Sequence, residues 1–369
     1  MALNCGIVGL PNVGKSTIFS ALTSAPAEAA NYPFCTINPN VGIVDVPDFR
    51  LKKLAEIFNP KRVVPATVEF VDIAGLVKGA SKGEGLGNQF LSHIREVGVI
   101  AHVVRCFDNP DIIHVANRVD PRDDIETINT ELALADLETL QKRRERAERA
   151  LKVQGKDQQK QAELTLLAIQ KVQAVLEQGK PARSAALSEE ERLALYDAHL
   201  ITMKPQIYVC NVDEQGMRGD NPYVAQVRSI AAAEGTEVIK ICGKFEAELA
   251  DLESEEEKQA FLAELGLEES GLSLLIHAAY RLLGLRTFFT AGEDECRAWT
   301  IHVGDTAPKA AGVIHSDFEK GFIKAEVYSF EDLITYGSEA KIKEAGKYRI
   351  EGKEYVVQDG DVMFFRFNV

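Results

Sequence analysis

The chain has 369 residues, with 42 Lys and Arg against 56 Asp and Glu, so its formal net charge is −14. This length is too great for one ordinary hydrophobic core, which excludes a small single-domain protein and predicts two or three structural units. The negative charge repels nucleic acid. We therefore expect no DNA partner, and any RNA contact must be local, where basic residues gather on one face.

The sequence shows neither a membrane span nor a targeting signal. No apolar run approaches the roughly eighteen residues that a spanning helix needs, and the N-terminal residues lack a charged region followed by an apolar stretch. The six cysteines are scattered singly, without a C-x-x-C pair, which is typical of reduced thiols. We expect a cytoplasmic monomer without a membrane partner.

Short apolar runs alternate with helical patterns in much of the chain. The runs cover residues 3–8, 67–72, 100–107 and 206–210, and they end in polar or glycine-rich turns. Such alternation is typical of βαβ units. We therefore predict an α/β fold with a mostly parallel sheet.

The first run leads into a glycine-rich loop. Residues 9–17, Gly-Leu-Pro-Asn-Val-Gly-Lys-Ser-Thr, fit G-x-x-x-x-G-K-[ST] between a strand-like run and a helical pattern. Glycines let backbone N–H groups turn toward a β-phosphate, and the following helix presents its positive end to the same anion. Lys15 would bridge the β- and γ-phosphates while Ser16 coordinates Mg²⁺. The sequence predicts a nucleoside triphosphate site.

Two later residues can complete the Mg²⁺ site. Asp72 begins the sequence Asp-Ile-Ala-Gly at the end of a strand-like run, where a carboxylate can hold Mg²⁺ through a water molecule. Thr36 lies in the loop after the first helix, where a hydroxyl can reach the metal only when the γ-phosphate is present. The alternative for Thr36 is a threonine that caps a turn.

The group that orients the attacking water is not evident. Many related hydrolases carry a glutamine after the Asp-x-x-Gly glycine, but this position is Leu76, which cannot hydrogen-bond to water. We therefore expect slow intrinsic hydrolysis. His114 is a candidate catalytic residue because its imidazole could titrate near neutrality, and a packed or solvated histidine is the alternative.

The α/β pattern is interrupted by helical spacing between Ile125 and Lys204. Two amphipathic stretches flank a polar turn near residues 155–159, which predicts an inserted antiparallel helical hairpin. Ser188 and Glu191 have the spacing of a capping box that opens a shorter helix. We accordingly expect the insertion to cover residues 125–204.

The run at 206–210 leads into a base-reading segment. Asn211-Val212-Asp213-Glu214 stands where guanine-binding switches carry Asn-Lys-x-Asp. The extra methylene of Glu214 displaces its carboxylate by on the order of 1.5 Å, enough to spoil a bidentate guanine contact. Backbone groups around Val212 and the turn at 242–244 could serve adenine better, so we expect ATP to be preferred over GTP.

The pattern changes again after Leu285. β-rich segments at 298–303, 322–328 and 355–358 surround a short helical stretch at 330–336, which predicts a small α+β domain. The expected domains are a nucleotide-binding domain at 1–124 and 205–284, the helical insertion at 125–204, and a C-terminal domain at 285–369.

These motifs together resemble the YchF family of Obg-related P-loop proteins. The resemblance is carried by residues 9–17, 31–39, 70–90 and 211–214 and extends over residues 2–369. It implies an Obg-type nucleotide-binding domain, an inserted helical hairpin, and a C-terminal TGS domain with a ubiquitin-like β-grasp fold. It further implies an ATP-preferring hydrolase with the Asn-x-x-Glu segment found here.

The resemblance also implies site residues and a partner. Ser16 and Thr36 are expected to face Mg²⁺, and Val212 to contact adenine. The residues expected to contact the nucleotide, including those of the base-reading segment, are Asn12, Val13, Gly14, Lys15, Ser16, Thr17, Asn211, Val212 and Glu214. The family is associated with ribosomes, and basic residues on the predicted hairpin give local support, although a solvated helix face explains them equally well: Lys142, Arg143, Arg144, Arg146 and Arg149.

The leading functional hypothesis is a Mg²⁺-dependent ATPase whose nucleotide state controls its affinity for a ribosomal or RNA partner. A non-enzymatic module that binds the ribosome or RNA, with nucleotide serving only to stabilise the fold, is the second. A GTP-specific assembly factor is the third, which Glu214 disfavours.

Overall fold

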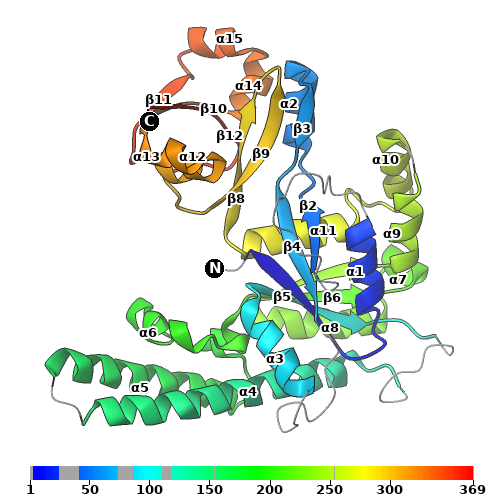
Figure 1. Cartoon of the computed structure of the whole chain (residues 1–369). Helices are drawn as coiled ribbons and strands as arrows, with labels where there is room; N and C mark the ends of the chain where they lie inside the picture. Colours follow the sequence, from blue (N-terminus) through cyan, green and yellow to red (C-terminus); the bar gives the residue numbers. More distant parts are fainter. Residues whose placement is uncertain are drawn as a thin grey trace. The chain divides into compact units, whose positions relative to one another are not determined.

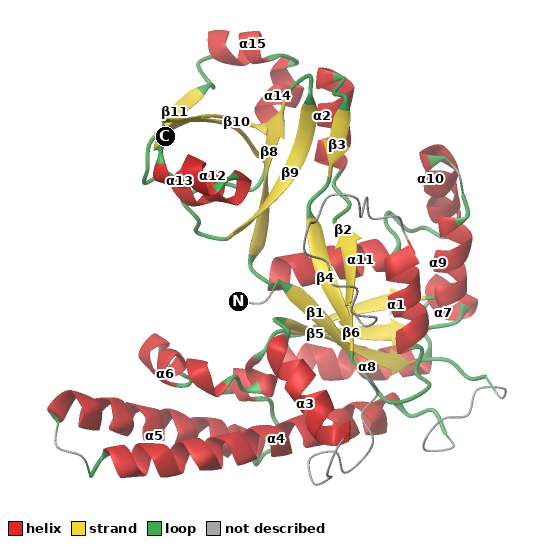
Figure 2. Ribbon diagram, viewed as in Figure 1, coloured by secondary structure: helices red, strands yellow, loops and turns green. Residues whose placement is uncertain are grey.

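The computed structural model describes residues 3–24, 41–73, 86–109, 118–152, 155–252 and 254–368. The chain divides into two compact units. The first comprises Met1–Gly42 and Glu69–Leu275, and the second comprises Ile43–Val68 and Ile276–Val369. Figures 1 and 2 show the elements of each unit.

The first unit is built on a six-stranded sheet in the order β2-β4-β1-β5-β6-β7. The pairs β1–β4, β1–β5, β5–β6 and β6–β7 are all parallel. Strands β5 and β6 are buried along their whole length, as expected of apolar runs in the middle of a sheet covered on both faces. This confirms the α/β fold and its mostly parallel sheet. The strand bounds are β1 Asn4–Val8, β2 Val41–Asp45, β4 Thr67–Asp72, β5 Val99–Arg105, β6 Gln206–Asn211 and β7 Glu237–Ile241.

Helices flank this sheet (Figure 2). Their bounds are α1 Lys15–Ser24, α3 Leu86–Glu96, α7 Glu214–Arg218, α8 Pro222–Glu234, α9 Gly243–Ala250, α10 Glu255–Glu264 and α11 Gly271–Leu282. One core cluster packs β5 and β6 against α8 and α9 through Tyr208, Val224, Val227 and Phe245, all at most 4% exposed. Because the sheet is parallel, the carboxyl ends of β1, β4 and β6 lie at one edge, where ligands bind in such folds.

The predicted helical hairpin is present as α4 Pro121–Ala150 and α5 Lys156–Leu176, which lie side by side in Figure 1. Its core contains Leu140, Ile169 and Val172, and each is fully buried. The following short helix, α6 Glu189–Ala194, begins with the predicted capping box of Ser188 and Glu191. Helix α5 begins at Lys156, so the predicted turn at 155–159 is placed a few residues too late.

A buried carboxylate ties the hairpin to the chain that leads into β6. Asp136 of α4 is 0% exposed and accepts hydrogen bonds from the backbone N–H groups of Ile201 and Thr202, both at 2.8 Å, and from the Thr202 hydroxyl at 2.7 Å. These residues belong to η4 Ile201–Met203, which follows η2 Ala182–Ser184 and η3 Tyr196–Ala198. The helices belong to the first compact unit, and the domain boundaries at 124, 204 and 284 stay a prediction.

The second unit contains a mixed six-stranded sheet in the order β11-β10-β12-β8-β9-β3. The strands are β3 Arg62–Val64, β8 Leu285–Ala291, β9 Glu295–His302, β10 Phe322–Ser329, β11 Arg349–Glu351 and β12 Asp361–Phe367. The helices are α2 Phe49–Phe58, α12 Ala307–Ile314, α13 Ser316–Lys320, α14 Phe330–Tyr336 and α15 Glu339–Glu344. The small α+β domain is thus present, with its core between α12 and the sheet around Phe288, Ala311 and Phe365.

Two features of the second unit differ from the sequence prediction. Residues 355–358 form no strand, because within them only Val356 makes an isolated bridge, to Thr306. The segment Ile43–Val68 also joins this unit, since β3 pairs in parallel with β9. Arg50 of α2 pairs with Asp48 of the same segment at 2.8 Å and with Asp359 at 2.7 Å, and the second ion pair ties the segment to the rest of the unit.

None of the helices described here is long and apolar enough to cross a membrane.

Candidate nucleoside triphosphate site

The predicted phosphate loop connects β1 to α1 at the carboxyl edge of the first sheet. Two of its residues have left-handed backbone conformations, Asn12 with φ 64° and Gly14 with φ 97°. Glycine adopts this conformation without strain, and asparagine tolerates it. A Cβ on Gly14 would also lie 2.1 Å from Nδ2 of Asn211, so a side chain does not fit there. The loop ends where α1 begins, which leaves the first N–H groups of that helix available to an anion.

Lys15, the first residue of α1, lies inside this loop. Its side chain is 7% exposed, and its Nζ donates a hydrogen bond to the carbonyl oxygen of Leu10 at 2.8 Å. Burial lowers the pKa of Lys15 below its ordinary value, and the negative charge of Asp72 partly opposes this. A phosphate group beside Nζ would stabilise the ammonium that burial disfavours.

Asp72 and Ser16 lie together at the end of β4 and the start of α1. The Ser16 hydroxyl donates to Oδ2 of Asp72 at 3.5 Å, while Oδ1 of Asp72 is buried without a hydrogen-bond partner among the described residues. Burial raises the pKa of Asp72, and the nearby charge of Lys15 and the Ser16 hydroxyl oppose that rise. An unpaired buried carboxylate oxygen is unfavourable unless a cation or donor binds it.

This pair of oxygens fits a magnesium ion better than any metal that needs an all-protein cage. In the part of the chain that the structure describes, no group of three or more His, Cys, Asp and Glu residues could hold a metal. Mg²⁺ commonly uses one or two protein oxygens and completes its shell with water and substrate phosphates. Ser16 and Asp72 could supply those protein oxygens, the second through a water.

The base-reading segment at the end of β6 contacts the phosphate loop. Asn211 donates from Nδ2 to the carbonyl oxygen of Val13 at 2.9 Å, which fixes the two loops to each other. Val212 is 2% exposed, and its N–H donates to the carbonyl oxygen of Ile241 at 2.9 Å. The turn after β7 reaches the same place, because a Cβ on Gly243 would lie 3.1 Å from the Thr17 side chain.

Glu214 has a partner that sequence reasoning missed. Its carboxylate pairs with the Lys244 ammonium, which lowers the pKa of Glu214. Glu214 is the first residue of α7, which Asp213 caps by accepting from the N–H of Gly216 at 2.8 Å. No sequence signal joins positions 214 and 244, because they meet only where β6 and β7 lie side by side.

The structure thus brings together most of the predicted site. The residues that meet around the phosphate loop are Asn12, Val13, Gly14, Lys15, Ser16, Thr17, Asp72, Asn211, Val212 and, at the rim, Glu214. Thr36, Leu76 and His114 lie outside the described residues, so their roles stay predictions.

Comparison with known proteins finds relatives along the whole chain. The chain is 58% identical over 369 residues to a Haemophilus ducreyi protein and 59% identical over 371 residues to a Bacillus subtilis protein, with complete coverage of both chains in each case; both are named ribosome-binding ATPase YchF. The solved structure of the Schizosaccharomyces pombe YchF GTPase superposes with a TM-score of 0.88 at 41% identity, covering 98% of this chain and 97% of that one. Residues 4–144 match a family described as 50S ribosome-binding GTPase, and residues 285–368 match the YchF GTPase C-terminal family, described as a protein of unknown function.

Proposed function

The chain belongs to the YchF family, and from this premise we propose that it is a Mg²⁺-dependent ATPase whose nucleotide state controls binding to the ribosome. The main observation in support of the proposed hydrolase activity is the arrangement of Lys15, Ser16 and Asp72 around the phosphate loop. A magnesium nucleotide supplies an anion beside the buried Lys15 ammonium and a cation beside Asp72, one of whose carboxylate oxygens is buried without a partner among the described residues.

Each residue of the proposed site has a separate task. The loop N–H groups and Lys15 bind the β- and γ-phosphates and disperse the charge that develops on them during cleavage. Ser16 would hold the magnesium ion directly and Asp72 would hold it through water, and the bound ion would neutralise phosphate charge. Thr36 would add a ligand in the triphosphate state, and His114 is proposed to lie near the attacking water.

The preference for ATP is supported by the state of Glu214. Guanine recognition requires a carboxylate free to accept two N–H groups, whereas Glu214 is engaged by Lys244. Adenine instead presents an amino donor, which backbone carbonyl groups beside Val212 can accept. The names of relatives include both ATPase and GTPase, so titrations with each nucleotide under matched conditions decide the question. Tighter binding of GTP would overturn the preference.

Ribosome binding is supported by the names of the relatives and by one face of α4. Within the basic cluster, Arg144 hydrogen-bonds to Gln173 of α5 and Arg143 pairs with Asp197 of η3 at 2.6 Å, so both already have partners within the protein. The other three, Lys142, Arg146 and Arg149, are exposed and recur at a spacing that places them on one face of α4. This stripe is the proposed contact with ribosomal RNA.

Two experiments test the proposal. Purified protein should release phosphate from ATP only when Mg²⁺ is present, and it should sediment with ribosomes at low salt in a nucleotide-dependent manner. Replacing the three exposed basic residues by glutamine should abolish sedimentation without changing phosphate release. Protein that never sediments with ribosomes, in any nucleotide state, would contradict the partner. The protein is further proposed to be a cytoplasmic monomer without DNA or membrane partners.

A further inference from the structure

The second unit contains a cavity of about 800 Å³ at the end of strand β8. The register of the two central strands explains its position. Val362 of β12 lies opposite Phe289 of β8, so Phe364 comes level with Ala291, the last residue of β8. The end of β12, residues 365–367, extends past β8 and, among the residues described, pairs only with β10. Strand β12 therefore presents a short free edge to the cavity.

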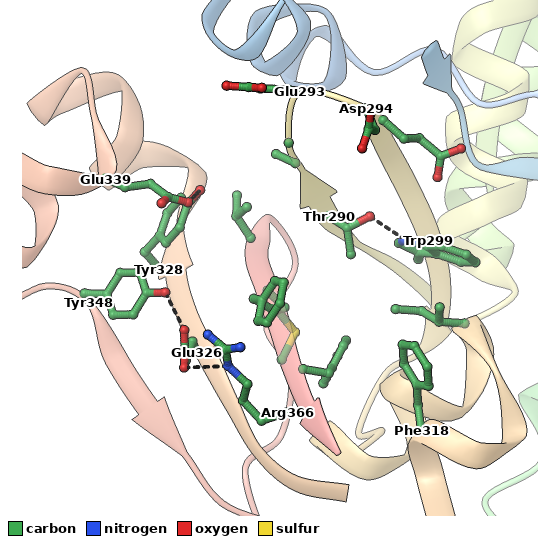
Figure 3. A pocket seen from close by; sticks show the side chains of 18 of the residues that line it. Thr290, Glu293, Asp294, Trp299, Phe318, Glu326, Tyr328, Glu339, Tyr348 and Arg366 are labelled. Atoms are coloured by element: carbon green, nitrogen blue, oxygen red, sulfur yellow. Dashed lines mark hydrogen bonds and ion pairs between the residues drawn. The ribbon is translucent and has the colours of Figure 1, made fainter. Parts of the chain in front are cut away.

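Aromatic side chains form two walls of this cavity (Figure 3). Trp299 and Phe318 lie on one side, where the Trp299 indole N–H donates to the Thr290 hydroxyl at 2.9 Å. Tyr328 and Tyr348 lie on the other side, with their rings stacked at a centroid distance of 5.8 Å. Cations of the chain already lie over two of these rings, Arg297 at 4.0 Å from the Trp299 centroid and Lys343 at 4.4 Å from the Tyr348 centroid. A bound segment would therefore meet these walls through apolar contacts.

The charge of the cavity is predominantly negative. Five carboxylates line it against two basic side chains, Lys343 and Arg366. The carboxylates are Glu293, Asp294, Glu295, Glu326 and Glu339. Three of them already have cationic partners: Asp294 with Lys61, Glu295 with Arg62, and Glu326 with Arg366.

The other two carboxylates stand against one further basic side chain of the lining, Lys343, so the cavity keeps a single net negative charge. Glu339 accepts a hydrogen bond from the neutral Tyr328 hydroxyl at 2.9 Å, and Glu293 is exposed at the turn between β8 and β9. Neither forms an ion pair within the described ranges. The cavity therefore favours a cationic ligand over the phosphate backbone of a nucleic acid.

We propose that this cavity binds an extended segment of another protein that carries lysine or arginine side chains. The backbone of the segment pairs with the free edge of β12, as in the addition of a strand to an exposed sheet edge. Its apolar side chains lie against Trp299 and Phe318, and a cationic side chain lies within reach of Glu293 or Glu339. This binding surface is separate from the nucleotide chemistry of the first unit.

The test uses Trp299, because it is the only tryptophan in the chain and it lines the cavity. The full-length protein is titrated with a short synthetic peptide of alternating lysine and valine while Trp299 emission is followed. A saturable change is expected. A peptide of alternating glutamate and valine and a single-stranded RNA oligonucleotide should produce none at the same concentrations. Equal binding of the acidic peptide or of the RNA would overturn the proposal, as would an unresponsive Trp299.

Variants and a modified peptide locate the contacts. Glu293→Lys should weaken the basic peptide by roughly twofold to fivefold, and Glu339→Gln, which keeps an acceptor for Tyr328, should do the same. The matched control is Glu354→Lys, an exposed residue of the same unit that does not line the cavity. A peptide methylated on alternate backbone nitrogens should bind more weakly than its parent, because it cannot pair with β12. If both variants and the methylated peptide bind like their parents, the segment does not lie in this cavity.

Discussion

The phosphate loop of the first unit and the aromatic cavity of the second unit differ in how far the protein itself compensates their charged groups. At the phosphate loop, burial shifts the pKa values of Lys15 and Asp72 toward their neutral forms, and Oδ1 of Asp72 has no hydrogen-bond partner among the described residues. At the cavity, Glu326 accepts from Arg366 at 3.1 Å and from the Tyr348 hydroxyl at 2.9 Å, so its charge is compensated within the protein.

This difference shows which ligand each region requires. Burial destabilises the charged forms of Lys15 and Asp72, and a small ligand of complementary charge stabilises them. The phosphate loop therefore suits a magnesium nucleotide. The carboxylates of the cavity that already form ion pairs add little binding energy for such a ligand. Binding to the cavity must therefore come from apolar contacts, backbone pairing and the two remaining carboxylates. The cavity therefore suits a longer, extended partner.

The largest expected effect is at Lys15. Replacing it by alanine removes the ammonium that binds the β- and γ-phosphates, so ATP hydrolysis should fall by on the order of a thousandfold. Phosphate release measures this change. The matched control is Lys160→Ala on the exposed face of α5, which should retain full activity. Wild-type turnover in the Lys15 variant would show that the phosphate loop takes no part in hydrolysis. It would also contradict the assignment of this loop as the nucleotide site.

Asp72→Asn should lower Mg²⁺-dependent hydrolysis by about a hundredfold while raising thermal stability in the absence of Mg²⁺. Burial raises the pKa of Asp72 in the folded state. Its contribution to stability is therefore fully present below the ordinary carboxyl pKa and is lost as the pH rises through the raised pKa. At neutral pH the ionised carboxylate destabilises the fold, and a neutral amide removes that effect.

Activity and the unfolding midpoint of the Asp72 variant are compared with and without magnesium. Wild type should be stabilised by magnesium nucleotide much more than the variant, because only wild type supplies a carboxylate to the ion. Asp251→Asn, at an exposed position, serves as the control. A variant that is less stable than wild type without magnesium would show that the carboxylate has a structural partner after all.

The opposite sign is expected for a charge in the second unit. Arg50 is paired with Asp48 and Asp359, and these partners raise its pKa despite burial. Arg50→Met should lower the free energy of unfolding by roughly 1–3 kcal/mol, because two carboxylates lose their partner. Urea unfolding measures this, with the exposed Lys53→Met as control. An unchanged midpoint would mean that α2 is held to this unit by apolar packing alone.

The two regions also differ in how much of them the sequence could predict. The phosphate loop is read from consecutive residues, since the turn, the ammonium and the hydroxyl fall within residues 9–17. The register of β8 and β12 depends instead on where two strands 70 or more residues apart meet, which no local pattern encodes.

The addition of residues 43–68 to the second unit was missed for the same reason. Strand β3 has three residues, too few for a period-2 signal, and its partner β9 lies more than 200 residues later in the chain. The ion pair of Arg50 with Asp359 and that of Glu214 with Lys244 likewise depend on the tertiary fold. Residues 355–358 show the converse error, because a β-rich segment there predicts a strand while the segment makes only the isolated bridge of Val356 with Thr306.

The smallest expected effect concerns the pair at the rim of the nucleotide site. Glu214 and Lys244 are exposed, with side chains 62% and 66% accessible, so solvent weakens their attraction. Lys244→Met frees the Glu214 carboxylate, and GTP should then gain on ATP by less than about tenfold, because backbone groups near Val212 still select adenine. Nucleotide titrations of Glu214→Gln, Lys244→Met and the double variant measure the coupling between the two residues. If Lys244→Met preferred GTP over ATP, this exposed pair, and not the buried backbone, would select the base. Charge compensation would then govern the nucleotide site as it does the cavity.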